Sequence, residues 1–85
     1  SAANMPTETI TEDIFKDGSV DILQLLISAN LATSRNEARR AVEQGGVSVN
    51  GEKVTDSHAT YEKEAFAEEF ILKKGKKKFC KVELA

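Results

Sequence analysis

The stretch that decides the fold is SRNEARRAVEQGGVSVNGEKV, residues 34–54. Ser34 and Glu37 have the spacing of a capping box, in which each side chain accepts a hydrogen bond from a backbone N–H that a helix start leaves unpaired. Small apolar residues then recur at helical spacing as far as Gly45 and Gly46. Because glycine readily adopts the left-handed conformation that ends a helix, the pattern predicts a helix over 35–44.

A hairpin follows this helix without a linker. Val47 and Val49 alternate with Ser48, which is the two-residue period of a strand. Asn50-Gly51 is the dipeptide most typical of a two-residue hairpin turn, because both positions tolerate a positive φ. The change of period at Gly46 therefore predicts a short helix joined directly to a β-hairpin.

Two further segments complete the expected fold. The run VDILQLLISANL has apolar residues on one helical face and predicts a helix over 21–31. Residues 70–85 predict a second, lysine-rich hairpin that turns at Lys74-Gly75-Lys76, with Cys80 facing the core and Phe79 facing away. Residues 1–18 are interpreted as a linker and extended lead-in, and residues 19–85 as the domain.

These elements predict an α+β fold in which two short packed helices lie against a small, mostly antiparallel sheet. The helices are joined by only two residues, so their apolar stripes have to pack against each other. The expected core consists of apolar residues from both helices and both hairpins: Ile22, Leu25, Leu26, Val42, Val47, Val49, Ile71, Cys80 and Val82.

The composition excludes several classes of protein. The single cysteine, Cys80, rules out an internal disulfide and a cysteine-built zinc site. The lone cysteine makes a reducing cytoplasm the expected location. No apolar run approaches the roughly 20 residues that cross a membrane. The only histidine, His58, lies in a turn-rich stretch without a serine or cysteine to activate, and no catalytic constellation is evident. The chain begins at Ser1, which suggests a fragment of a longer protein.

Charge is distributed unevenly along the chain. Residues 34–53 and 73–85 hold ten of the twelve lysines and arginines and four of the fourteen acidic residues, a local net charge of +6. The remaining residues carry −8, although the whole chain carries only −2. Such segregation predicts a basic face that binds a polyanion on an acidic body. The alternative is that the lysine-rich hairpin merely keeps an edge strand soluble.

The pattern of Ser34-Arg35, Ala38-Arg39, Gly46-Val47, Val49 and Asn50-Gly51 resembles the alpha-L RNA-binding motif, named for ribosomal protein S-four. The resemblance covers about residues 20–56. Proteins with this motif include a ribosomal protein, pseudouridine synthases, heat-shock ribosome-binding proteins and bacterial tyrosyl-tRNA synthetases.

The closing segment Phe70–Phe79, FILKKGKKKF, and the lead-in Met5-Pro6-Thr7 look like the C-terminal domain of bacterial tyrosyl-tRNA synthetases. This resemblance implies that the domain grips tRNA(Tyr), while an absent upstream catalytic domain attaches tyrosine with ATP and Mg²⁺. It implies a homodimeric parent held together by the catalytic domain, whereas the fragment is expected to be a monomer without a cofactor or membrane contact. The acidic stretch 62–69 has no counterpart among the expected RNA contacts.

The resemblance and the residue types together give a set of candidate RNA-binding residues. Arg35 and Arg39 lie one helical turn apart, and each can bind a phosphate with two hydrogen bonds. Arg40 is equally well explained as an RNA contact and as a solvated charge. Lysines supply charge without reading base sequence. The full set is Ser34, Arg35, Arg39, Arg40, Asn50, Lys53, Lys73, Lys74, Lys76, Lys77 and Lys78.

Three alternatives remain beside a synthetase domain. A pseudouridine synthase fragment is disfavoured because the motif usually begins those chains. A stand-alone ribosome-binding protein would carry the same motif. Only the resemblance of the closing hairpin distinguishes a synthetase domain from such a protein. A helix-turn-helix DNA reader is disfavoured by the hairpin that directly follows the second helix.

Overall fold

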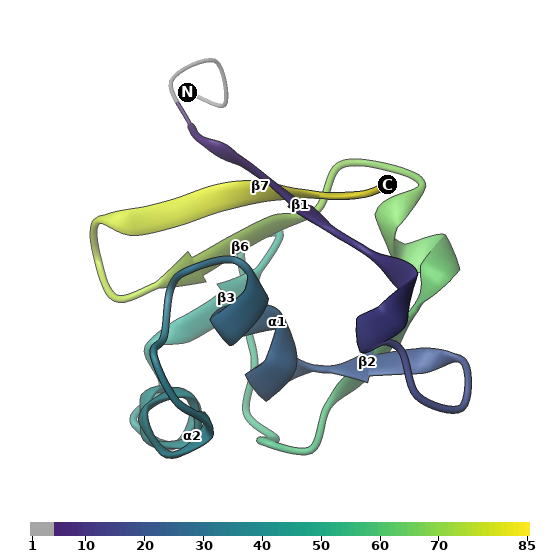
Figure 1. Ribbon diagram of the computed structural model, residues 1–85. Coiled ribbons are helices and arrows are strands. Elements are labelled where there is room, and N and C mark those ends of the chain that lie inside the picture. Colours follow the sequence, from purple (N-terminus) through teal and green to yellow (C-terminus); the bar gives the residue numbers. More distant parts are fainter. Residues whose placement is uncertain (1–4) are drawn as a thin grey trace.

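Two short helices lie on one side of a five-stranded sheet in the computed structural model, which describes residues 5–85 (Figure 1). The predicted α+β class is confirmed. The first four residues of the expected lead-in lie outside the described residues.

The strands β1, β7, β6, β3 and β4 form the main sheet in that order, and β2 pairs with β5 in a separate two-stranded sheet. All pairs are antiparallel except β1 with β7, which is parallel. The elements in chain order are β1 (Thr7–Ile10), η2 (Glu12–Ile14), β2 (Ser19–Asp21), α1 (Ile22–Ser28), α2 (Arg35–Glu43), β3 (Val47–Val49), β4 (Glu52–Lys53), β5 (Thr60–Glu62), η3 (Lys63–Phe66), β6 (Ile71–Lys74) and β7 (Lys78–Leu84).

The first helix is shorter than the sequence predicts. Asp21 caps α1 by accepting a hydrogen bond of 2.9 Å from the N–H of Gln24, but the helix ends at Ser28 rather than at residue 31. Asn30 adopts a φ of 62°, and the N–H of Leu31 bonds back to the carbonyl of Leu26 at 2.9 Å. The left-handed Asn30 and this hydrogen bond are features of a Schellman cap, which turns the chain toward α2 and ends the helix early.

The second helix follows its prediction closely. The hydroxyl of Ser34 accepts from the N–H of Glu37 at 3.1 Å, and Gly45 ends the helix with a φ of 75°. The hairpin turn also has the expected geometry, because Asn50 and Gly51 both have positive φ values, 51° and 86°. The end of the helix, the turn and the strand between them were therefore all predicted correctly from the sequence.

The core joins both helices to the inner face of the sheet. Seven of the nine predicted core residues are buried, from Ile22 on α1 to Val82 on β7. Val49 is partly buried and packs against the core, whereas Ile71 is partly buried and is not among the residues packed against it, so the assignment of Ile71 was wrong. In place of Ile71, its neighbours Phe70 and Leu72 point inward and are 2% and 0% exposed.

The lead-in takes part in the sheet. β1 runs along β7 in parallel, with Thr7 opposite Lys81, and Ile10 is buried at 2% exposure. Figure 1 shows this strand crossing the sheet beside the C-terminal strand. Ile14 and Phe15 then pack against the core from η2 and the loop that follows it.

Candidate nucleic-acid interface

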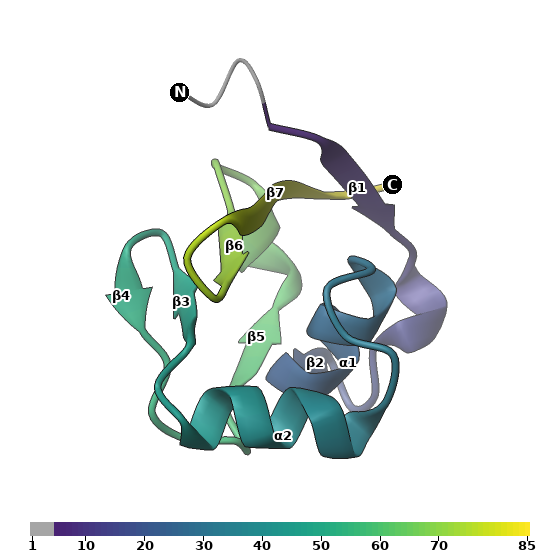
Figure 2. The ribbon, with the colours of Figure 1, turned by 90° about the vertical axis from the view of Figure 1, so that its left-hand side faces the viewer.

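A groove of about 440 Å³ lies where the end of α2 meets both hairpins, and we call it the basic groove. Figure 2 shows the β3–β4 hairpin, the β6–β7 hairpin and the C-terminal end of α2 on the same side of the molecule. The groove is lined by three lysines and by residues of small side chain or exposed backbone: Gly45, Gly46, Val47, Ser48, Gly51, Lys53, Lys73, Gly75 and Lys76.

Local structure fixes where the three lysines of this groove stand. Ser48 on β3 is opposite Lys53 on one side and Lys73 on the other, so both lysines project from the same face of the sheet. The ammonium of Lys53 lies 3.3 Å from the position that a Cβ would take on Gly45. A cation is favoured there, because the C-terminal end of a helix carries partial negative charge.

The third lysine is held by a backbone contact between distant turns. The N–H of Gly75 donates to the carbonyl of Gly46 at 2.7 Å, which joins the β6–β7 turn to the end of α2. Lys76 follows directly and lines the groove. Glycine is favoured at Gly45 and Gly75 by their positive φ values of 75° and 73°, whereas a Cβ on Gly46 would make only an ordinary contact with the Gly75 nitrogen at 3.8 Å.

The lysines of the groove keep their charge available to a ligand. Among residues 5–85, none of Lys53, Lys73 and Lys76 takes part in a salt bridge. Lys53 and Lys76 are exposed along with Lys73. Three uncompensated ammonium groups around one hollow repel each other, and a bound anion relieves that repulsion.

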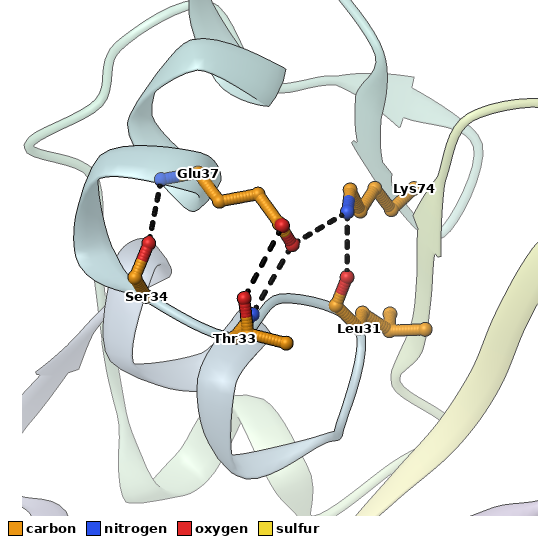
Figure 3. Close-up of polar contacts among 5 residues, drawn as sticks. All are labelled: Leu31, Thr33, Ser34, Glu37 and Lys74. Atoms are coloured by element: carbon orange, nitrogen blue, oxygen red, sulfur yellow. Dashed lines mark hydrogen bonds and ion pairs between the residues drawn. The ribbon is translucent and has the colours of Figure 1, made fainter.

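Lys74 does not line this groove, and its side chain points toward Leu31 and Glu37 (Figure 3). Its ammonium donates to the carbonyl of Leu31 at 2.8 Å and to the carboxylate of Glu37 at 3.0 Å. The hydrogen bond from Lys74 and the one from the N–H of Thr33, at 3.1 Å, lower the pKa of Glu37 below 4.5. The Glu37 carboxylate thus accepts from the N–H of Thr33, the residue before the cap. Lys74 joins β6 to the junction of the two helices.

Lys77 and Lys78 are separated from the basic groove as well. They line a neighbouring hollow of about 280 Å³, together with Pro6, Glu8 and the end of α1 around Asn30. The five lysines expected at one tip therefore point in three directions.

The arginines of α2 differ in how freely they are held. Arg35 lies 3.3 Å from Asp21, the cap of α1, and its side chain is 51% exposed. Arg39 donates to the side-chain oxygen of Asn36 at 2.9 Å and is partly exposed. Arg40 is exposed in the last turn of the helix, which is the end that borders the basic groove.

Ser34 and Asn50 have structural partners within the fold. Ser34 caps α2, as described above. The side-chain oxygen of Asn50 accepts from the N–H of Ile71 at 2.7 Å, and its own N–H donates to the carbonyl of Ile71 at 2.8 Å. Asn50 thereby holds the turn of the first hairpin against β6 and positions Lys53.

An acidic cleft adjoins the basic groove on the other side of the Asn50-Gly51 turn. It has a volume of about 570 Å³ and is lined by Glu64, Glu68 and Glu69 together with that turn, Ala65 and Ile71. The acidic stretch that the sequence left without a role therefore forms a defined surface. It marks a limit beyond which a polyanion is repelled.

The glycines of the groove were missed as site residues by sequence reasoning. Gly45 and Gly46 were interpreted only as a helix stop, and Gly75 only as part of a turn. The signal was present in the lysine run, because a lone glycine among five lysines indicates a backbone position with positive φ, which Gly75 adopts at 73°.

Other chemistry receives little support from the described residues. Burial, with a smaller contribution from Glu8, raises the pKa of the Cys80 thiol to about 11, so this thiol stays protonated at neutral pH. In residues 5–85, no three His, Cys, Asp or Glu side chains are grouped so that they could hold a metal ion. None of the helices described here has the length and apolar character required to cross a bilayer.

Comparison with known proteins places this arrangement in a family. Residues 1–82 match the family described as "Tyrosine--tRNA ligase SYY-like C-terminal domain". The chain belongs to this family. The predicted resemblance is therefore confirmed, and no finding favours the pseudouridine synthase, ribosome-binding or DNA-binding alternatives.

Individual relatives agree with the family match. The chain is 43% identical over 81 residues to the tyrosine--tRNA ligase of Lachnoclostridium phytofermentans. This match covers 93% of this chain and 20% of the relative. It is 42% identical over 84 residues to that of Clostridium perfringens strain SM101, covering 98% and 20%. For Treponema denticola the identity is 39% over 80 residues, covering 92% and 20%. The chain thus spans about one fifth of the length of these relatives.

Proposed function

We propose that this chain is the tRNA-binding domain of a tyrosyl-tRNA synthetase and that the basic groove holds the phosphate backbone of tRNA(Tyr). The observation that carries the proposal is that three lysines, Lys53, Lys73 and Lys76, line one groove together with four glycines, and that within residues 5–85 none of these lysines forms a salt bridge. Small residues let a phosphate approach the backbone, and lysines supply charge without selecting a base. The names of the relatives, tyrosine--tRNA ligase, support the assignment to this aminoacyl-tRNA synthetase.

The proposed face continues along α2. Arg40 is exposed at the end that borders the groove, and Arg39 lies one residue before it. Arg35 is shared with Asp21, so its removal disturbs a cap contact as well as a phosphate contact. Ser34 and Asn50 act by positioning α2 and the first hairpin. Lys77 and Lys78 give a secondary phosphate contact, and Lys74 serves the fold.

The rest of the reaction is assigned to other parts of the protein. We propose that a catalytic domain of the longer protein attaches tyrosine with ATP and Mg²⁺ in the cytoplasm, and that it forms the homodimer. The domain described here contributes affinity and orientation. Recognition through backbone shape suits A-form RNA, whose major-groove base edges are inaccessible to side chains.

Salt-dependent binding tests the proposal. The chain is titrated against a tRNA(Tyr) transcript, and against a tRNA with a short variable arm, at several salt concentrations. Each phosphate contact that is lost should lower the log–log salt slope by about 0.7 to 0.9. Lys53→Ala and Lys73→Ala should each show this reduction, whereas Lys16→Ala, an exposed lysine outside the groove, should leave the slope unchanged.

The arginines provide a second arm of the same experiment. Arg39→Ala and Arg40→Ala should weaken binding, because each removes a charge-assisted contact of about 1.5–3 kcal/mol if it is fully formed. Equal slopes for wild type and both lysine variants would remove the basic groove from the binding face. Unchanged affinity of both arginine variants would confine the face to the hairpins.

A further inference from the structure

The outer face of the main sheet carries an apolar cluster that does not belong to the core. Within residues 5–85, Phe79 and Ile71 are partly buried but are not among the apolar residues packed against the core cluster, unlike the other partly buried apolar residues on the strands, such as Val49 and Leu84. Together with Met5 they line a hollow of about 370 Å³, which also borders Ser48, Gly51 and Lys73. This hollow adjoins the basic groove, because the two share Ser48, Gly51 and Lys73.

Phe79 is the phenylalanine that stands apart from the other rings. Phe15, Phe66, Phe70 and Tyr61 form edge-to-face or stacked pairs with one another, at centroid distances from 4.5 to 6.1 Å. Phe79 takes part in none of these pairs among residues 5–85. Phe79 is half-buried, and it lines the hollow on the outer face.

The strand register surrounds this ring with positive charge. Lys73 on β6 is directly opposite Phe79, and Lys53, Ser48, Lys73 and Phe79 form one row across four neighbouring strands. Lys81 lies in the next row, opposite Ile71. Adjacent strands are about 4.8 Å apart, so the ring is an immediate neighbour of the groove lysine. Glu83 alternates onto this face further along β7 and is exposed, and the acidic cleft meets the hollow at Gly51 and Ile71.

We propose that this outer face is a stacking site for one unpaired base of an RNA, with Phe79 as the platform and Lys73 and Lys81 as contacts for the flanking phosphates. Single-stranded nucleic acids are bound by such a combination, because every base has an aromatic face and every nucleotide carries a phosphate. The proposal rests on the proposed function, which it extends from backbone contacts to a base. An apolar segment of a protein also fits a hydrophobic hollow, but the lysines around this one favour an anionic ligand.

Removal of bases from the RNA isolates the stacking contact. One probe is an RNA stem-loop with a six-nucleotide adenine loop, and the other is the same stem-loop with abasic loop positions. The wild-type chain should bind the intact loop about 5- to 100-fold more tightly, which is the range for stacking of one base on an aromatic side chain. A 2-aminopurine placed in the loop should change its fluorescence on binding as its stacking environment changes.

Three variants assign that preference to its residues. Phe79→Leu should lose the preference, because leucine fills the hollow without an aromatic face, and Phe79→Tyr should retain it. Lys73→Ala should weaken binding of both RNAs by a similar factor, because both keep their phosphates. The wild-type comparison of the two loops needs no variant, so the test holds even if Phe79→Leu unfolds.

The failures of the two proposals are distinguishable. If the wild-type chain binds both loops equally, or if Phe79→Leu keeps the preference, stacking is overturned while the phosphate-binding role stands. A Phe79→Leu chain that behaves as wild type would also fit a face that contacts protein, which contradicts the stacking site. If neither loop binds to the wild-type chain, stacking is overturned, and the phosphate-binding role fails as well only if tRNA(Tyr) also does not bind.

Discussion

The basic groove and the acidic cleft lie on either side of one tight turn, and both are lined by Gly51. One is surrounded by lysines from two hairpins, and the other by glutamates from the segment around η3. The net charge of −2 averages these two surfaces and describes neither. The difference shows that local charge, rather than net charge, acts on a polyanion. The lysines of the groove attract it, and the glutamates of the cleft repel it.

Reversing one charge in the groove should erase much of the difference between the two surfaces. Lys73→Glu places a carboxylate between the groove and the outer sheet face, and should lower the affinity for tRNA(Tyr) by about 10- to 100-fold at 0.1 M salt. Lys16→Glu makes the same change of charge outside the groove and should stay within about twofold of wild type. Fluorescence anisotropy measures both, and equal losses would mean that only total charge matters.

Two adjacent lysines on β6 should separate binding from stability. Lys74→Ala removes the hydrogen bond to the Leu31 carbonyl and should lower the free energy of unfolding by about 1–2 kcal/mol. Lys73→Ala removes an exposed side chain and should leave the free energy of unfolding almost unchanged. Urea denaturation checks both variants. A stable Lys74→Ala chain with weakened RNA binding would reverse the roles assigned here.

Neutralising the cleft should sharpen the comparison from the other side. The triple variant Glu64→Gln, Glu68→Gln and Glu69→Gln removes repulsion near the shared turn and should raise RNA affinity by about two- to fivefold at low salt. The gain should vanish above about 0.5 M salt, where exposed charges are screened. A gain that persists at high salt would indicate a direct contact of the cleft with RNA.

The smallest effect concerns the pH dependence of stability. The pKa of Glu37 is lowered in the folded chain by its bonds to Lys74 and Thr33, so its ionised form stabilises the fold above pH 4.5. That contribution is lost as the pH falls through the lowered folded-state value. The stability difference between wild type and Glu37→Gln should therefore be present at pH 7 and shrink below pH 4.5 in urea titrations. A difference independent of pH would exclude this ionisation.

Local chemistry made much of the fold predictable. The capping serine, the glycine stop and the Asn50-Gly51 turn each act through their own backbone, so their effect needs no distant partner. Alternation along β7 likewise indicated that Cys80 faces inward and Phe79 outward. The helix over 35–44 and both hairpins follow from such signals.

Features that depend on distant partners were harder to predict. Phe70, Ile71 and Leu72 are all apolar, so their sequence does not show which of them faces the core. Lys74 looks like its neighbours until its partner Glu37 is known, 37 residues away in the chain. The early end of α1 was missed because Leu31 continues the apolar pattern, although its role is to complete the cap at Leu26.

The parallel pairing of β1 with β7 has a consequence for folding kinetics. Thr7 pairs with Lys81 although almost the whole chain lies between them, which makes this contact one of the most non-local in the molecule. Loop closure over such a distance is slow relative to the local assembly of α2 with its hairpin. We therefore expect β1 to dock last during refolding, and its amides to become protected after those of β3 and β6 in pulse-labelled hydrogen exchange. Protection of β1 at the same time as β3 would contradict this order.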